Sequence, residues 1–171
     1  MVDDTRPRSE VLRALCAVEV VLPNRFAERQ DGRMEMRAQI QQANDEIYAA
    51  WNAHDPDAVV ARYDEDVEVV DVTSGITAVG RNEIYAIAVD RLAGFPDFSL
   101  ERRVLLIDGT LSSDRWVMYG TQTGEYQGLP PTGRSVEILG ATFSEYDERG
   151  LVLRETHQID VAGLLRQLGL D

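Results

Sequence analysis

Apolar side chains recur every three or four residues in three stretches of the chain, and this spacing predicts helices. The longest stretch is 34–51, where one apolar stripe runs from Met36 to Trp51. Asp55 and Pro56 begin a second helix, which ends near residue 63, because the aspartate can cap free amides and proline is tolerated at the first helical position. A third helix is expected over 81–93, ended by Gly94 and Pro96.

Elsewhere apolar and polar residues alternate, which predicts strands over 67–72, 76–79, 98–107, 115–126, 135–146 and 151–160. Asp108-Gly109 is a hairpin signal between two of these strands. Helices followed by a run of strands indicate a single α+β domain, in which a curved mixed or antiparallel sheet wraps around the N-terminal helices. The concave face of such a sheet is a natural place for a ligand cavity.

The segment 128–169 is the most informative part of the chain. Its Pro-Pro-Thr-Gly sequence at 130–133 must reverse the chain, so the strands at 135–146 and 151–160 are predicted to form a hairpin. In the second of these strands the period of two places Glu155, His157 and Ile159 on one face. In the strand at 67–72, Asp71 shares a face with apolar Val67 and Val69. We interpret both faces as possible walls of a pocket.

Length and charge narrow the classes of function. The chain has 171 residues, and we expect an extension over 1–33, either an accessory helix or a partly disordered arm, before one domain over 34–171. There are 17 basic and 30 acidic residues, a formal charge of −13, which argues against binding to nucleic acids. The single cysteine, Cys16, favours a reducing, cytoplasmic environment, and no apolar run is long enough to cross a membrane. No metal-binding or nucleotide-binding motif is present, so no cofactor is expected.

Several motifs together resemble one family. These are Trp51-Asn52-Ala53-His54-Asp55, Gly80-Arg81, the Gly-Leu-Pro-Pro-Thr-Gly-Arg sequence at 128–134, and the closing Gly-Leu-Leu-Arg-Gln-Leu-Gly at 163–169. Over roughly residues 36–170 the chain is similar to SnoaL-like polyketide cyclases, which belong to the cone-shaped superfamily of ketosteroid isomerase. The resemblance implies intramolecular aldol cyclisation of a polyketide, with no metal or organic cofactor, in a homodimer.

The resemblance also implies positions for the site. The aspartate that the cyclases carry on their last strand corresponds to His157 here, and the histidine on the preceding strand corresponds to Thr142. The isomerase pattern places its general base at Asp71. It places its essential helix tyrosine at Ile47, next to Tyr48.

We therefore predict His157 and Asp71 as the catalytic residues. An imidazole can remove a proton next to a carbonyl group and return it, and a carboxylate in an apolar cavity is suited to the same task. Asp71 either orients His157 or is itself the base. The alternative for Asp71 is a structural role, in which its carboxylate caps the turn at the end of the strand. The alternative for His157 is a hydrogen-bonded structural residue within the sheet. Glu155 is predicted as a substrate contact, either as a second carboxylate of the site or as a residue at the rim of the pocket, and we favour the rim. The remaining predicted substrate contacts are Thr142, Tyr48, Trp51, Tyr119 and Phe143.

Three functions remain open at this point. The first is a cyclase or isomerase that moves a proton next to a carbonyl of a hydrophobic small molecule. The second is a binding protein for a hydrophobic polycyclic ligand that has lost this chemistry. The third is an assembly module whose pocket is filled by its own side chains.

Overall fold

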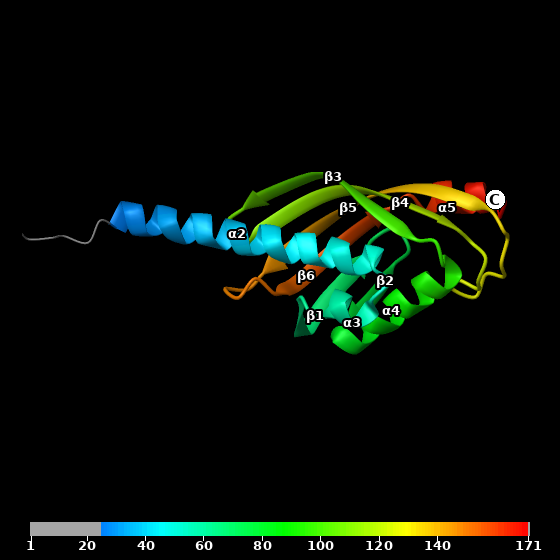
Figure 1. Cartoon of the computed structure of the whole chain (residues 1–171), viewed down its shortest axis with the longest axis horizontal. Helices are drawn as coiled ribbons and strands as arrows, with labels where there is room; N and C mark the ends of the chain where they lie inside the picture. The colour runs from blue at the N-terminus through cyan, green and yellow to red at the C-terminus, as the bar shows by residue number, and fades with distance from the viewer. Residues whose placement is uncertain (1–24, 171) are drawn as a thin grey trace, which may run out of the picture. The chain divides into compact units, whose positions relative to one another are not determined.

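The computed structural model describes residues 25–170, and Figure 1 shows the arrangement of their helices and strands. The chain divides into two units, Met1–Gly32 and Arg33–Asp171, and the second unit contains the whole sheet. Most of the extension predicted over 1–33, including Cys16, lies outside the described residues. The helix predicted over 34–51 begins earlier, at Arg25. Residues 25–33 are mostly polar and charged and carry no apolar stripe, so periodicity alone did not detect this start.

The elements follow the predicted order, with the third helix between the second and third strands, and one further short helix follows the last strand. They are α2 (Arg25–Asn52), α3 (Pro56–Val60), β1 (Tyr63–Asp71), β2 (Ile76–Val79), α4 (Arg81–Gly94), β3 (Ser99–Asp108), β4 (Leu111–Thr121), β5 (Ser135–Tyr146), β6 (Val152–Ile159) and α5 (Val161–Leu168).

The six strands form one open, mixed sheet with the order β2-β1-β6-β5-β4-β3. Strands β1 and β6 are parallel, and the other neighbouring pairs are antiparallel. The hairpin predicted from the Pro-Pro-Thr-Gly segment is β5 and β6, paired from Gly140 opposite Ile159 to Tyr146 opposite Val152. The α+β class and the mixed sheet agree with the prediction.

The predicted stripe of the long helix is buried and belongs to the main core. Ile40, Ala43 and Ile47 are among its least exposed residues, and they share one hydrophobic cluster with side chains from the sheet. Figure 1 shows α3 and α4 beside the β1 and β2 end of the sheet. The cap predicted at Asp55 is present, since its carboxylate accepts a hydrogen bond of 3.0 Å from the amide of Ala58. A cavity, described below, lies between the helices and the sheet.

Two strands differ from the prediction by several residues. Strand β1 begins at Tyr63 rather than at residue 67, and β4 spans Leu111–Thr121 rather than 115–126. The turn at Asp108-Gly109 is tight, with Gly109 at a φ of 60°, so Leu111 already pairs with Asp108. The following segment, 122–134, is a loop tied together by buried Gln122, whose side chain accepts a hydrogen bond of 2.8 Å from the Thr132 hydroxyl.

Candidate functional site

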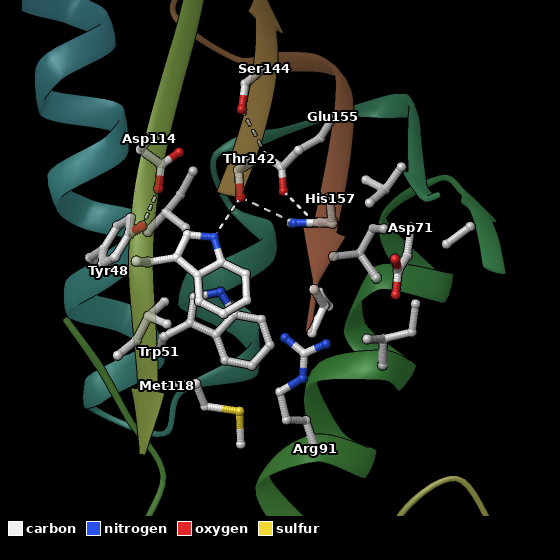
Figure 2. A pocket seen from close by; sticks show the side chains of 18 of the residues that line it. Tyr48, Trp51, Asp71, Arg91, Asp114, Met118, Thr142, Ser144, Glu155 and His157 are labelled. Carbon is white, nitrogen blue, oxygen red and sulfur yellow. Dashed lines mark hydrogen bonds and ion pairs between the residues drawn. The ribbon is translucent and has the colours of Figure 1, made fainter. Parts of the chain in front are cut away.

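A cavity lies between the concave face of the sheet and the helices α2 and α4. It contains about 1040 Å³ of space free of protein atoms, counting its open mouth. Helix α2 contributes Tyr48 and Trp51, and α4 contributes Arg91. The cavity is open at its mouth, so the chain's own side chains do not fill it completely. Figure 2 shows the cavity with its principal side chains.

Four polar residues form one row across the sheet wall of this cavity. In the pairing of the strands, Asp114 of β4 is opposite Thr142 of β5, Thr142 is opposite His157 of β6, and His157 is opposite Asp71 of β1. All four residues line the cavity. The pairing of β1 with β6 thus brings the two predicted catalytic residues, which are 86 positions apart in the sequence, onto neighbouring strands.

Hydrogen bonds connect part of this row into a chain. The indole Nε1 of Trp116 donates to Oγ1 of Thr142 at 2.8 Å, and Oγ1 of Thr142 lies 3.2 Å from Nδ1 of His157. Nε2 of His157 lies 2.8 Å from Oε1 of Glu155. An ionised carboxylate only accepts hydrogen bonds, so Nε2 carries a proton in this pair. In neutral His157, Nδ1 is then an acceptor, and the Thr142 hydroxyl donates to it.

Glu155 is the last residue in this series of hydrogen bonds, and it is buried, with 6% of its surface exposed. Its carboxylate also accepts hydrogen bonds from the hydroxyls of Tyr63, at 3.2 Å, and Ser144, at 3.3 Å. The expectation that Glu155 lies at the rim was therefore wrong. Burial, together with the charge of Glu155, raises the pKa of Tyr63 well above its ordinary value, so this phenol stays protonated and remains a donor.

Asp71 lines the cavity but uses its carboxylate in the turn that follows β1. Its oxygens accept hydrogen bonds from the amides of Thr73, at 2.9 Å, and Ser74, at 3.4 Å, and from the Ser74 hydroxyl at 2.7 Å. The carboxylate group that contacts the His157 ring belongs to Glu155. The geometry thus supports a structural role for Asp71 at the end of β1. Glu155, rather than Asp71, is placed to orient the His157 ring.

Asp114 is a further acidic group in the cavity, and sequence reasoning missed it. It is 3% exposed and accepts a hydrogen bond from the hydroxyl of Tyr48. Burial raises the pKa of Asp114 from 3.8 to about 6, against the opposing effect of the Tyr48 hydrogen bond. Burial and the charge of Asp114 also raise the pKa of Tyr48. Asp114 alternates with Ser112 and Trp116 on one face of β4, but the predicted strand began only at residue 115, so this signal was lost.

Of the aromatic contacts predicted, Tyr48 and Trp51 line the cavity, whereas Tyr119 and Phe143 do not. Tyr119 follows Met118, and Phe143 lies between Thr142 and Ser144, so alternation turns both toward the other face of the sheet. Phe143 is 50% exposed there, and the Tyr119 hydroxyl accepts a hydrogen bond from Arg103. The prediction that these two residues contact the ligand was wrong for this reason.

The position of Trp116 depends on a glycine in the neighbouring strand. Gly140 is paired with Trp116 across β4 and β5, and a Cβ atom at residue 140 would overlap the indole ring. The absence of a side chain at Gly140 leaves room for the indole beside β5, where its Nε1 reaches Thr142. The glycine therefore supports the hydrogen-bonded chain that ends at Glu155.

Within residues 25–170, no group of three or more His, Cys, Asp and Glu side chains is arranged to hold a metal ion. None of the helices described there is long and apolar enough to cross a membrane.

The cavity and the polar row lie in an α+β domain with one mixed sheet. The family model described as "SnoaL-like polyketide cyclase" matches residues 38–168, and the chain belongs to this family. Comparison with curated protein sequences gives no match.

Solved structures show the same fold. The chain is similar to TsrD from Streptomyces laurentii, with 24% identity and a TM-score of 0.71 over 79% of this chain and 98% of that one. It is also similar to IdmH from Streptomyces antibioticus, described as a candidate polyketide cyclase, with 24% identity and a TM-score of 0.66 over 77% and 99% of the two chains. A protein from Catenulispora acidiphila, described as having a ketosteroid isomerase-like fold, has 19% identity and a TM-score of 0.64 over 75% and 93%. At these identities the likeness establishes the fold.

Proposed function

We propose that the chain is a cyclase or isomerase that moves a proton at a carbon next to a carbonyl group in a hydrophobic, polyketide-type small molecule, with no metal or organic cofactor. The observation that carries this proposal is the chain of hydrogen bonds from Trp116 through Thr142 and His157 to Glu155, set in the wall of a mostly apolar cavity. Family membership supports the same class of reaction.

In this proposal the two sides of the His157 ring have different tasks. The N–H group at Nε2 donates a hydrogen bond to Glu155, which fixes the ring and stabilises the imidazolium that forms when Nδ1 takes up a proton. Nδ1 removes the proton from the carbon next to the carbonyl. The electron pair of the broken C–H bond moves into the enolate, and in an aldol closure this carbon attacks a second carbonyl. The imidazolium then returns its proton to the resulting alkoxide.

Thr142 has to change its partner for this reaction to occur. Its hydroxyl donates to Nδ1 of His157 in the structure described above. When a substrate carbonyl enters, rotation of the hydroxyl hydrogen toward the carbonyl oxygen frees Nδ1 and supplies a donor to the developing oxyanion. Trp116 continues to donate to the Thr142 oxygen and holds it in place. Asp114, with a pKa of about 6, is a second proton carrier in the same cavity at neutral pH.

One observation favours a second candidate, a binding protein without catalysis. Both ring nitrogens of His157 have protein partners, so the imidazole has no free nitrogen until Thr142 rotates. A ligand that did not displace the Thr142 hydroxyl would bind in the cavity and leave unchanged.

Solvent deuterium exchange separates the two candidates. The probe is 2-tetralone, a bicyclic ketone whose C1 protons lie next to its carbonyl group, and the readout is loss of their proton NMR signal in deuterated buffer. The proposal predicts exchange above the buffer rate with the native chain. It also predicts loss of this excess in His157→Ala at an unchanged thermal unfolding midpoint. Binding of 2-tetralone without accelerated exchange supports the binding protein and contradicts the enzyme.

A further inference from the structure

We propose that Arg91 forms a subsite for a carboxylate group on the small molecule that occupies the cavity. This inference rests on the proposed function only in taking that molecule to be its substrate. It narrows the substrate class to hydrophobic ring systems that carry an acid group at the end remote from the reacting carbonyl.

Arg91 lies in the last turn of α4, and its side chain lines the cavity. The guanidinium carbon lies 5.3 Å from the centre of the Trp51 ring, a cation–π contact that restricts the side chain. Figure 2 shows the guanidinium directed into the cavity, on the side away from Asp114 and Ser144. A ligand that spans the cavity can thus reach Arg91 with one end and the Thr142 and His157 pair with the other.

Within residues 25–170, Arg91 makes no ion pair or side-chain hydrogen bond to another residue. The arginines that do form ion pairs with aspartate or glutamate in this range are Arg33, Arg62, Arg102, Arg103, Arg149 and Arg154. A guanidinium has five N–H donors in a planar fork, which matches the two oxygens of a carboxylate. Arg91 presents this fork to the cavity without a protein partner.

The carboxylates of the cavity, by contrast, already have hydrogen-bond partners within the protein. Asp71 accepts hydrogen bonds within its turn, Asp114 accepts one from Tyr48, and Glu155 contacts His157, Tyr63 and Ser144. Of the charged side chains in the lining, Arg91 is the one that forms neither an ion pair nor a side-chain hydrogen bond within residues 25–170. A neutral apolar ligand would remove water from Arg91 without replacing its hydrogen bonds, whereas a carboxylate replaces them with charge-assisted ones.

The overall charge of −13 acts against this preference at long range, since it repels anions. The selectivity must therefore come from contact with Arg91 itself. A control variant that removes the same charge outside the cavity therefore distinguishes contact with Arg91 from an effect of overall charge.

The test is a calorimetric titration of 2-naphthoate and of the uncharged 2-naphthamide into the native chain and three variants. The variants are Arg91→Met, Arg91→Lys and Arg115→Met. Arg115 is exposed, forms no ion pair in the described part of the chain, and follows Asp114 on the opposite face of β4, so its replacement removes the same charge outside the cavity.

The native chain is expected to bind the carboxylate about tenfold more tightly than the amide, since a charge-assisted hydrogen bond contributes about that much affinity. Arg91→Met should abolish the difference by weakening the carboxylate alone, Arg91→Lys should keep part of it, and Arg115→Met should keep all of it. Equal affinities for both probes in the native chain, or no binding of the carboxylate, would overturn the proposal. Equal weakening of both probes in Arg91→Met would instead assign Arg91 to packing against Trp51. Exchange of 2-tetralone, which has no acid group, tests the proposed function separately.

Discussion

Oε1 of Glu155 lies 2.8 Å from Nε2 of His157, and the two side chains are two residues apart on one face of β6. Only the period of two in the strand is needed to bring them onto the same face. The pair places a buried carboxylate behind a histidine that faces a cavity, as in enzymes in which a histidine acts as the base.

Glu155→Gln should keep a hydrogen-bonding group beside His157 but remove the charge that stabilises the imidazolium. We expect the rate of 2-tetralone exchange to fall by about a hundredfold or more, with little change in the substrate concentration for half-maximal rate, because the lost interaction belongs to the protonated ring. Ser144→Ala is the matched control, because it removes one weaker contact to Glu155 and leaves the charge. An exchange rate in Glu155→Gln equal to that of the native chain would show that the carboxylate has no part in the reaction.

Asp71→Asn tests the assignment of Asp71 to the turn after β1. An amide oxygen can accept only part of the hydrogen bonds that the carboxylate receives from Thr73 and Ser74. We therefore expect a loss of about 1 kcal/mol in the free energy of unfolding, measured with denaturant, and an exchange rate within a few-fold of native. A rate reduced a hundredfold in a folded variant would restore Asp71 as the base.

Asp114→Asn should change how stability depends on pH. The folded pKa of Asp114, about 6, is above its ordinary value of 3.8, so folding favours the protonated form. This contribution to stability is fully present below pH 4 and is lost as the pH rises through 6, a difference of about 3 kcal/mol. Asparagine does not titrate, so the variant should gain stability relative to the native chain between pH 4 and pH 7.

The measurement is the difference in denaturant unfolding free energy between the native chain and Asp114→Asn at several pH values. Other titrating groups are common to both proteins and cancel in this difference. A difference that stays constant from pH 4 to pH 7 would mean that the Asp114 carboxyl titrates alike in the folded and unfolded chains.

Gly140→Ala should disturb the site through Trp116. A methyl group at residue 140 would overlap the indole ring, which has to move away from Thr142. We expect a loss of about 1 to 3 kcal/mol of stability and a shift in tryptophan fluorescence. Gly120→Ala is the control, since its Cβ would lie 3.1 Å from Phe95, a contact that a small movement relieves. Equal losses in the two variants would indicate a general cost of alanine in the sheet.

Local patterns were sufficient for much of the fold. The cap at Asp55, the hairpin of β5 and β6, and the shared face of Glu155 and His157 depend on neighbouring residues, and each is present in the structure. The start of β4 was misplaced because polar residues at its beginning hid the alternation. That single error removed Asp114 from consideration.

The composition of the site depends on contacts between distant segments. The buried carboxylate of Glu155 accepts a hydrogen bond from the hydroxyl of Tyr63, 92 residues earlier, and no local pattern contains this information. Both faces of β4 and both faces of β5 carry large apolar side chains, so hydrophobicity alone did not distinguish the face toward the cavity from the opposite face. The alternation that places Thr142 in the cavity also turns its neighbour Phe143 away from it.

The most direct test of the account is the tautomer of His157, observed by nitrogen-15 NMR of the imidazole ring in the native chain at pH 8. The donors and acceptors around the ring predict a proton on Nε2, directed to Glu155, and an unprotonated Nδ1 that accepts from Thr142. His157→Gln identifies the signals by their disappearance. A ring protonated on Nδ1, or one that exchanges freely between the two tautomers, would contradict the arrangement from which the proposed proton transfer was derived.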